Sequence, residues 1–166
     1  CNGAFAEIGM QINSEKFRAL ANQMLFNSEL PYTLPYNQST FSLDGSSDDW
    51  EKLQTAIGQG KTQITPLHNL MIVSAIANGG TYTKPIFFTK ILDRNGKILI
   101  DNEPETRQAL KDSTAYLLTS AMQDVMQSNT MYTRSGSGVK STGTTAAIPN
   151  MSCAGKSGTT TSNVDV

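Results

Sequence analysis

Apolar residues recur at helical spacing in four segments of this chain. Residues 2–12 place several of them on one face, and residues 17–25 repeat them at intervals of three and four. Asn13 or Ser14 stands directly before the second repeat, where a helix cap belongs. The pattern therefore predicts two consecutive amphipathic helices near the start of the chain.

The third helical segment has the clearest ends. Thr65 stands at a capping position, Pro66 occupies the first turn, and Asn78-Gly79-Gly80 closes the segment. Its apolar stripe is wide, which predicts a largely buried helix. The fourth segment opens at Asp112 or Ser113 and carries an apolar inner face as far as Met126.

The remaining pattern predicts two long loops and a few strands. Residues 27–45 and 127–145 are rich in Pro, Ser, Thr, Asn and Gly, which indicates loops. Asn95-Gly96 between two apolar runs predicts a hairpin over residues 86–101, and residues 152–160 are predicted as a last strand. The order predicts an α+β fold, with helices packed on an antiparallel sheet. Because only about three strands are visible, we expect the domain to be incomplete in this chain.

Composition excludes several classes of protein. The chain has 166 residues, a net charge of −1 and no basic run, so it does not have the profile of a nucleic-acid-binding protein. No apolar stretch reaches the roughly 20 residues of a membrane span. One histidine and two cysteines make a poor metal-ligand set, and we expect neither a metal nor a cofactor.

The candidate chemistry lies in residues 154–160, Ala-Gly-Lys-Ser-Gly-Thr-Thr. Gly155 and Gly158 lack side chains, so a ligand backbone can approach closely. Lys156 offers a compact positive charge, and in a strand Ser157 and Thr159 would present hydroxyls on the same side. This combination predicts a site for an anionic ligand, in particular a carboxylate.

Three motifs in chain order resemble the transpeptidase domains of penicillin-binding proteins, most closely the bifunctional, class A type. Cys1-Asn2 resembles the end of a Ser-x-Asn box at the head of a helix. Residues 58–60 (Gly-Gln-Gly), followed by 65–67 (Thr-Pro-Leu) and 77–80, resemble that family's helix-opening signature. Residues 154–160 resemble its Lys-Thr/Ser-Gly box, and residues 142–144 (Thr-Gly-Thr), Ala147 and residues 148–150 (Ile-Pro-Asn) resemble the run-in to that box. His68 stands where we expect Gln, and we interpret it as a capping or packing residue.

The resemblance implies the penicillin-binding protein and serine β-lactamase fold and a D,D-transpeptidase that cross-links peptidoglycan stem peptides through a serine ester. Asn2 would hydrogen-bond the substrate amide, and Lys156 would keep the pocket electropositive and tune the proton relay. Ser157 and Thr159 would bind the terminal carboxylate, with the Thr159 N–H as an oxyanion donor, while Gly158 would let the strand lie against the substrate. β-Lactam antibiotics would bind at the same place.

The nucleophile is missing from this pattern. Ser137 and Lys140 have Ser-x-x-Lys spacing, but they stand in a predicted loop and follow Asn2, so we interpret them as a coincidence. We therefore expect residues 1–166 to be part of a transpeptidase domain, from inside the Ser-x-Asn box to just past the Lys-Ser-Gly box, and to be inactive alone. The remainder of the domain would supply the nucleophile, and a membrane helix would hold the parent protein at the extracytoplasmic face of the membrane.

Two alternatives stay open at this point. A β-lactamase or a penicillin-sensing receptor of the same superfamily would carry the same boxes and differ in the fate of the acyl-enzyme. A non-enzymatic cell-envelope binding module would keep the Lys-Ser-Gly segment only as architecture.

Overall fold

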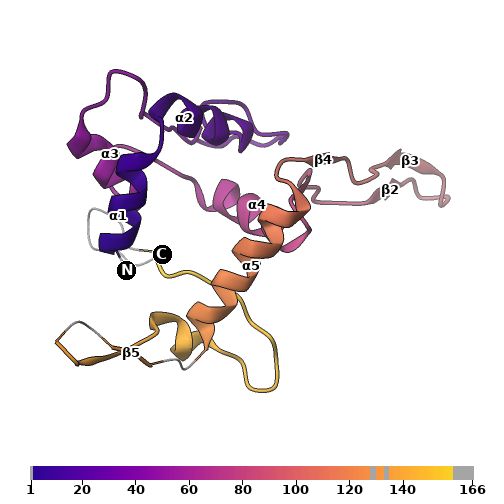
Figure 1. The fold of residues 1–166 in the computed structure, drawn as a ribbon. Coiled ribbons are helices and arrows are strands. Elements are labelled where there is room, and N and C mark those ends of the chain that lie inside the picture. Colours follow the sequence, from indigo (N-terminus) through magenta and orange to yellow (C-terminus); the bar gives the residue numbers. More distant parts are fainter. Residues whose placement is uncertain (1, 128–129, 133–134, 159–166) are drawn as a thin grey trace.

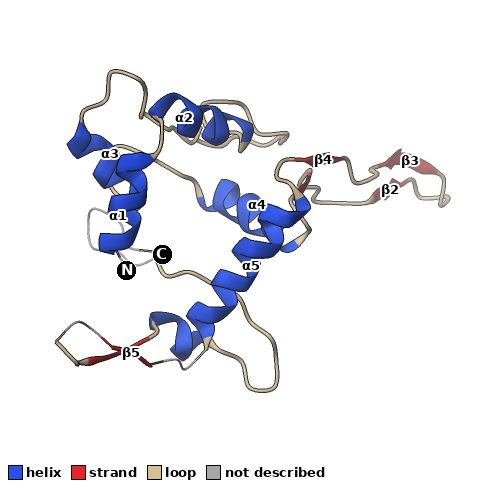
Figure 2. Ribbon diagram, viewed as in Figure 1, coloured by secondary structure: helices blue, strands red, loops and turns tan. Residues whose placement is uncertain are grey.

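The computed structural model describes residues 2–127, 130–132 and 135–158, and its elements are shown in Figures 1 and 2. The described helices are α1 (Asn2–Gln11), α2 (Ser14–Gln23), α3 (Asp49–Ala56), α4 (Pro66–Ala77) and α5 (Asp112–Met126), with a 3-10 helix, η1 (Thr142–Ala146). The described strands are β1 (Thr81–Thr83), β2 (Lys90–Leu92), β3 (Ile98–Asp101), β4 (Thr106–Gln108), β5 (Thr130–Tyr132) and β6 (Gly138–Lys140).

These strands pair as three separate two-stranded antiparallel sheets: β1 with β4, β2 with β3, and β5 with β6. The β2–β3 hairpin projects as an arm from the body of the molecule, as Figure 1 shows. The predicted α+β class is confirmed, and the described strands do not form a single larger sheet.

The main core lies between the end of α2, the helix α4 and the β1–β4 pair. Its buried apolar residues are Met24, Leu30, Met71, Ala75, Tyr82 and Ala109. The carbonyl of Met24 accepts hydrogen bonds from His68 Nε2 at 2.7 Å and from the Tyr82 hydroxyl at 2.8 Å. One buried carbonyl thus joins α2, α4 and β1.

His68 is a packing residue, as the sequence predicts. It is 0% exposed and lies 4.8 Å from the Phe26 ring, measured between ring centroids. Because a carbonyl only accepts, His68 Nε2 carries a proton and donates to Met24, and Nδ1 has no partner among the described residues. Burial lowers the pKa of His68 below its ordinary value of 6.5, which keeps the ring neutral at neutral pH.

The helix ends follow from local capping. Asn13 Oδ1 accepts the Lys16 N–H at 3.0 Å, and Thr65 Oγ1 accepts the His68 N–H at 3.2 Å, so both predicted caps are confirmed. Helix α3 was not predicted, although Asp48 and Glu51 have the spacing of a capping box and Asp48 Oδ1 accepts the Glu51 N–H at 2.8 Å.

Two predictions near the end of the chain are wrong. Residues 127–145 are not simply a loop, because β5, β6 and η1 lie there. Residues 152–158 form no strand, because no described segment pairs with them in a ladder. The rest of that predicted strand falls outside the described residues. The predicted loop over residues 27–45 is confirmed, apart from a single bridge between Thr40 and Gln63.

The predicted burial of α4 is only partly correct. Its buried residues are His68, Met71 and Ala75, whereas Leu70 is 62% exposed. On α5, Leu117 of the predicted inner face is 66% exposed, and the helix is buried only at Ala115. Each helix therefore packs through part of its apolar surface and leaves the rest uncovered.

The buried histidine makes the stability of the fold depend on pH. Below pH 6.5 the unfolded chain takes up a proton that the folded imidazole resists, so the free energy of unfolding falls as the pH is lowered, by at most about 1.4 kcal/mol per pH unit. We expect His68→Gln, which keeps an N–H donor and does not titrate, to lose this dependence. Urea midpoints at pH 7.5 and 5.5 measure it. Equal pH dependence in both proteins would contradict the assignment.

Candidate functional site

The Lys-Ser-Gly segment is held against the last turns of α5. The Gly155 N–H donates to the Met122 carbonyl at 3.1 Å, and Gln123 Nε2 donates to Ser152 Oγ at 3.1 Å. A Cβ at Gly155 would lie 3.0 Å from Met126 Sδ, so the absence of a side chain lets the segment approach the helix this closely. The segment is thus positioned by a helix rather than by a sheet.

The 3-10 helix η1 is attached to the same end of α5. The Ser141 hydroxyl donates to the Val125 carbonyl. A Cβ at Gly143 would lie 2.7 Å from that same carbonyl oxygen and 2.8 Å from Met126 Sδ. Because η1 and the Lys-Ser-Gly segment share this support, Thr142 Oγ1 comes within 3.2 Å of Ser157 Oγ.

Lys156 and Ser157 form a small cluster of hydrogen-bond donors. Lys156 Nζ lies 2.9 Å from the Ser157 carbonyl oxygen and 3.4 Å from Ser157 Oγ. Both side chains are exposed, and no carboxylate in the described part of the chain forms an ion pair with Lys156. An exposed ammonium beside a hydroxyl can bind a carboxylate, as the sequence predicts.

The other predicted site residues are not joined to Lys156 and Ser157 by side-chain hydrogen bonds in the described part of the chain. Gly158 is exposed and follows Ser157 directly, whereas Thr159 lies outside the described residues. Asn2 is exposed at the first position of α1, a helix that packs on α3 where Gly9 meets Ala56. Within the described residues, no hydrogen bond connects Asn2 to Lys156 or Ser157.

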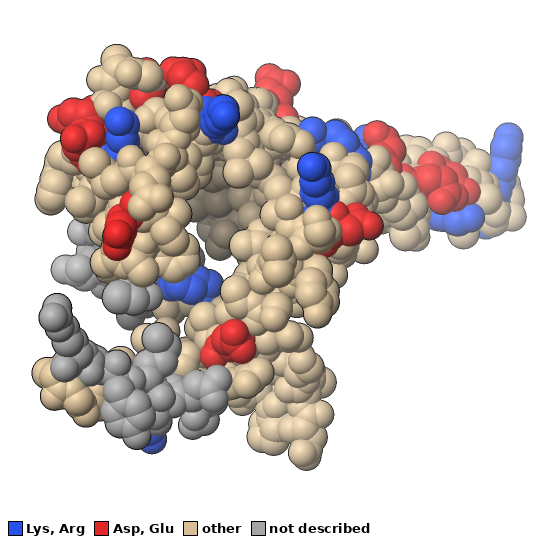
Figure 3. Space-filling view, viewed as in Figure 1, with Lys and Arg blue, Asp and Glu red and all other residues tan. Residues whose placement is uncertain are grey.

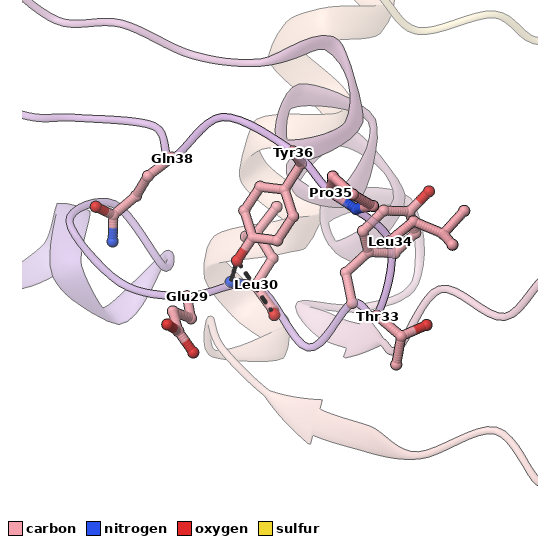
Figure 4. Close-up of a pocket in the computed structure, with 8 residues that line it drawn as sticks. Glu29, Leu30, Thr33, Leu34, Pro35, Tyr36 and Gln38 are labelled. Atoms are coloured by element: carbon pink, nitrogen blue, oxygen red, sulfur yellow. Dashed lines mark hydrogen bonds between the residues drawn. The ribbon is translucent and has the colours of Figure 1, made fainter.

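A pocket in the described part of the chain lies elsewhere, in the loop that follows α2. It measures about 490 Å³ and includes Leu30, Tyr32, Leu34 and Tyr36 in its lining, but none of the predicted site residues. Figure 4 shows the Tyr36 ring across this hollow, with its hydroxyl accepting the Leu30 N–H at 2.5 Å. The pocket is therefore formed by residues of this one loop.

Another pocket borders the Lys-Ser-Gly segment. It measures about 160 Å³ and lies between the end of α5 and the segment after η1, with Gln123, Met126, Ser152 and Cys153 among its lining residues. Lys156 and Ser157 line neither of these two pockets, and both residues are exposed.

The Ser-x-x-Lys pair at Ser137 and Lys140 lies on the β5–β6 hairpin. Lys140 ends β6 opposite Thr130, and both members of the pair are exposed. Because the pair does not stand at the start of a helix, its surroundings are not those of the family's nucleophile, in agreement with its interpretation as a coincidence.

Charged side chains are scattered over the face shown in Figure 3, and both signs occur along the projecting hairpin. Lys90 and Asp101 form an ion pair across that hairpin at 3.0 Å, and Lys84 and Glu105 form another beside the β1–β4 pair at 2.6 Å. Within the described ranges, no helix combines the length and hydropathy that crossing a bilayer requires.

Sequence comparison assigns nearly the whole chain to one family. Residues 1–165 match the family model described as the penicillin binding protein transpeptidase domain. The chain is 30% identical over 101 residues to penicillin-binding protein 1A/1B of Bacillus subtilis, covering 61% of this chain and 10% of that protein. It is 29% identical over 124 residues to the peptidoglycan D,D-transpeptidase PbpA of Mycolicibacterium smegmatis, covering 74% of this chain and 25% of that protein.

Solved structures agree with this assignment. The D,D-transpeptidase domain of a peptidoglycan glycosyltransferase from Eggerthella lenta superposes with a TM-score of 0.79 at 27% identity, over 95% of this chain and 39% of that chain. Penicillin-binding protein A of Mycobacterium tuberculosis, as its imipenem acyl-enzyme, superposes with a TM-score of 0.77 at 25% identity, over 96% of this chain and 34% of that chain. The chain thus spans well under half of each of these relatives.

The close packing of η1 on α5 gives a testable prediction. We expect Gly143→Ala to lower the free energy of unfolding by about 1–3 kcal/mol, because the added methyl group meets the backbone of Val125. Thr145→Ala, at an exposed position of the same 3-10 helix, is the matched control and should stay close to the wild-type protein. Thermal unfolding measures both, and equal melting temperatures would show that η1 does not pack on α5 as described.

Proposed function

Because this chain belongs to the penicillin-binding protein transpeptidase family, we propose that it forms part of a serine D,D-transpeptidase that cross-links peptidoglycan stem peptides. The observation that carries the proposal is the exposed ammonium and hydroxyl pair of Lys156 and Ser157, which lies in a segment that resembles the family's third active-site box. The family match over residues 1–165 supports the same assignment.

The proposed reaction is an acyl transfer in two steps. A serine oxygen attacks the carbonyl carbon of the D-Ala-D-Ala amide, the C–N bond breaks, and the terminal D-Ala leaves with the serine proton on its nitrogen. The amine of a neighbouring stem peptide then attacks the serine ester, the C–O bond breaks, and the serine oxygen recovers a proton. The result is a new amide between two stem peptides.

Each site residue of this chain has a distinct task in that reaction. Lys156 keeps the pocket electropositive, which attracts the terminal carboxylate, and tunes the proton relay. Ser157 and Thr159 bind that carboxylate by donating their hydroxyl protons. Gly158 leaves room for the substrate backbone, and Asn2 hydrogen-bonds the substrate amide. The Thr159 N–H is an oxyanion donor, which stabilises the negative charge that develops on the carbonyl oxygen.

The same site would bind β-lactam antibiotics. The solved structures similar to this chain include penicillin-binding protein A of M. tuberculosis as its imipenem and penicillin G acyl-enzymes. A β-lactam carries a strained amide beside a carboxylate, so Lys156 and Ser157 are suited to hold that carboxylate while the serine opens the ring.

We propose that further segments of a larger domain complete the fold around this chain. Tyr116 and Leu117 on α5 are 74% and 66% exposed, and Leu70 on α4 is 62% exposed. Figure 3 shows that much of the surface over α5 carries no charged side chain. Burying such side chains is favourable by about 1.5–3 kcal/mol each. The parent protein would be of the class A type and anchored in the membrane, with this domain on its extracytoplasmic face and the nucleophilic serine on a segment outside residues 1–166.

We expect Lys156→Ala in the full-length protein to slow acylation by a fluorescent penicillin about 10²–10³-fold, because one charged donor to the carboxylate is lost. Lys140→Ala removes the same side chain from the exposed β6 strand and is the matched control, for which we expect the wild-type rate. Stopped-flow acylation measures both. Equal rates in the two variants would remove Lys156 from the site.

We also expect residues 1–166 alone to form no covalent adduct with penicillin, whereas the full-length protein gains the mass of one penicillin. Intact-mass spectrometry after incubation distinguishes the two results. An adduct on the short chain would place the nucleophile within it, and Ser137→Ala would then show whether Ser137 is that nucleophile.

A further inference from the structure

The donor cluster of Lys156 and Ser157 has a third member, Thr142. We infer that Thr142 is a positioning residue, which orients the Ser157 hydroxyl so that its proton points toward the substrate carboxylate. This inference rests on the proposed function of Ser157. Its structural basis is the 3.2 Å separation between Thr142 Oγ1 and Ser157 Oγ, across 15 residues of sequence.

Counting donors and acceptors shows why Ser157 needs a partner. A hydroxyl has one proton to donate, and its oxygen accepts from other donors. If Ser157 donates to Thr142, its proton points away from an incoming carboxylate. If Thr142 donates to Ser157 instead, the serine proton is free for the ligand.

Lys156 alone cannot produce this orientation reliably. Its ammonium has only donors, and the shorter of its two contacts is with the Ser157 carbonyl oxygen, at 2.9 Å, while Ser157 Oγ is 3.4 Å away. Thr142 is therefore the closer side-chain partner of the Ser157 hydroxyl. In a chain of hydrogen bonds from Thr142 through Ser157 to the carboxylate, each bond polarises and strengthens the next.

Thr142 is well suited to this task because its backbone is fixed. It begins η1, between Ser141, whose hydroxyl donates to the Val125 carbonyl, and Gly143, which packs against the same carbonyl. Thr144 Oγ1 donates to the Ser141 carbonyl at 3.1 Å and closes the turn. The position of Thr142 is thus set by α5, which also holds the Lys-Ser-Gly segment through Gly155.

The test uses the full-length protein and two replacements of Thr142. Thr142→Val keeps the shape of the side chain and removes its hydroxyl. We expect it to lower the second-order rate constant for acylation by a fluorescent penicillin about 5–10-fold, as the loss of one hydrogen bond predicts. Thr142→Ser keeps the hydroxyl and should restore the rate to within twofold of wild type. Thr145→Val, on an exposed position of η1, is the matched control and should acylate at the wild-type rate.

A double-mutant cycle separates positioning from a structural effect. If Thr142 acts through Ser157, Thr142→Val has no further effect in a Ser157→Ala background. Thr142→Val should raise the penicillin concentration that gives half the maximal acylation rate more than it lowers the limiting rate itself. The reason is that the carboxylate contact supports binding before the serine attacks. Melting temperatures of all variants, measured alongside, identify any that are unfolded.

Three results would overturn the inference: wild-type acylation by Thr142→Val, an equal loss in Thr142→Ser and Thr142→Val, or a full Thr142→Val effect when Ser157 is already alanine. The proposed function fails in a different way, since it requires the wild-type full-length protein to be acylated and Ser157→Ala to be slower. A wild-type protein that penicillin does not acylate would reject that function, and the role of Thr142 with it.

Discussion

The buried carbonyl of Met24 is the constraint on which the arrangement of this chain depends. It accepts hydrogen bonds from His68 of α4 and Tyr82 of β1, and the Leu25 backbone that follows has a φ of 71°, which turns the chain sharply after α2. A buried carbonyl left without hydrogen-bond donors would cost about 1–3 kcal/mol of stability. The two donors avoid this cost, and because they come from different elements they also hold α2, α4 and β1 together. Helix α4 in turn packs against α5, and α5 carries the Lys-Ser-Gly segment.

The sequence predicted those parts of the fold whose causes are local. Thr65 and Asn13 cap their helices through neighbours three residues away, and Asn95-Gly96 makes a turn that depends on Gly96 adopting a φ of 80°. Helix α3 has an equally local signal in the cap of Asp48 on the Glu51 N–H, so it too is predictable from sequence. The strand predicted from residue 152 was wrong for another reason: a strand needs a neighbour, and single-chain periodicity does not say whether one is present.

The sequence predicted which residues belong to the candidate site, but not how they are arranged in space. The small residues, the lysine and the hydroxyls of residues 154–158 follow directly from the motif, and the structure brings Lys156 and Ser157 together because they are adjacent. The contact between Thr142 and Ser157 could not be predicted in this way. It arises because η1 and the segment beyond it both return to the last turns of α5, and no periodicity in the sequence encodes that return.

This shared support has a consequence for how the site works. In a sheet, a ladder of backbone hydrogen bonds fixes a substrate-binding strand along its length. In the described part of this chain the segment is tied to α5 by one backbone hydrogen bond at Gly155, by the contact of Gln123 with Ser152 and by close packing on Met126. Its side chains therefore take their positions from α5, and the direction of the Ser157 hydroxyl depends on what α5 holds beside it. A change in the last turn of that helix would alter carboxylate recognition without touching Lys156 or Ser157, because the helix positions both partners of the hydroxyl pair.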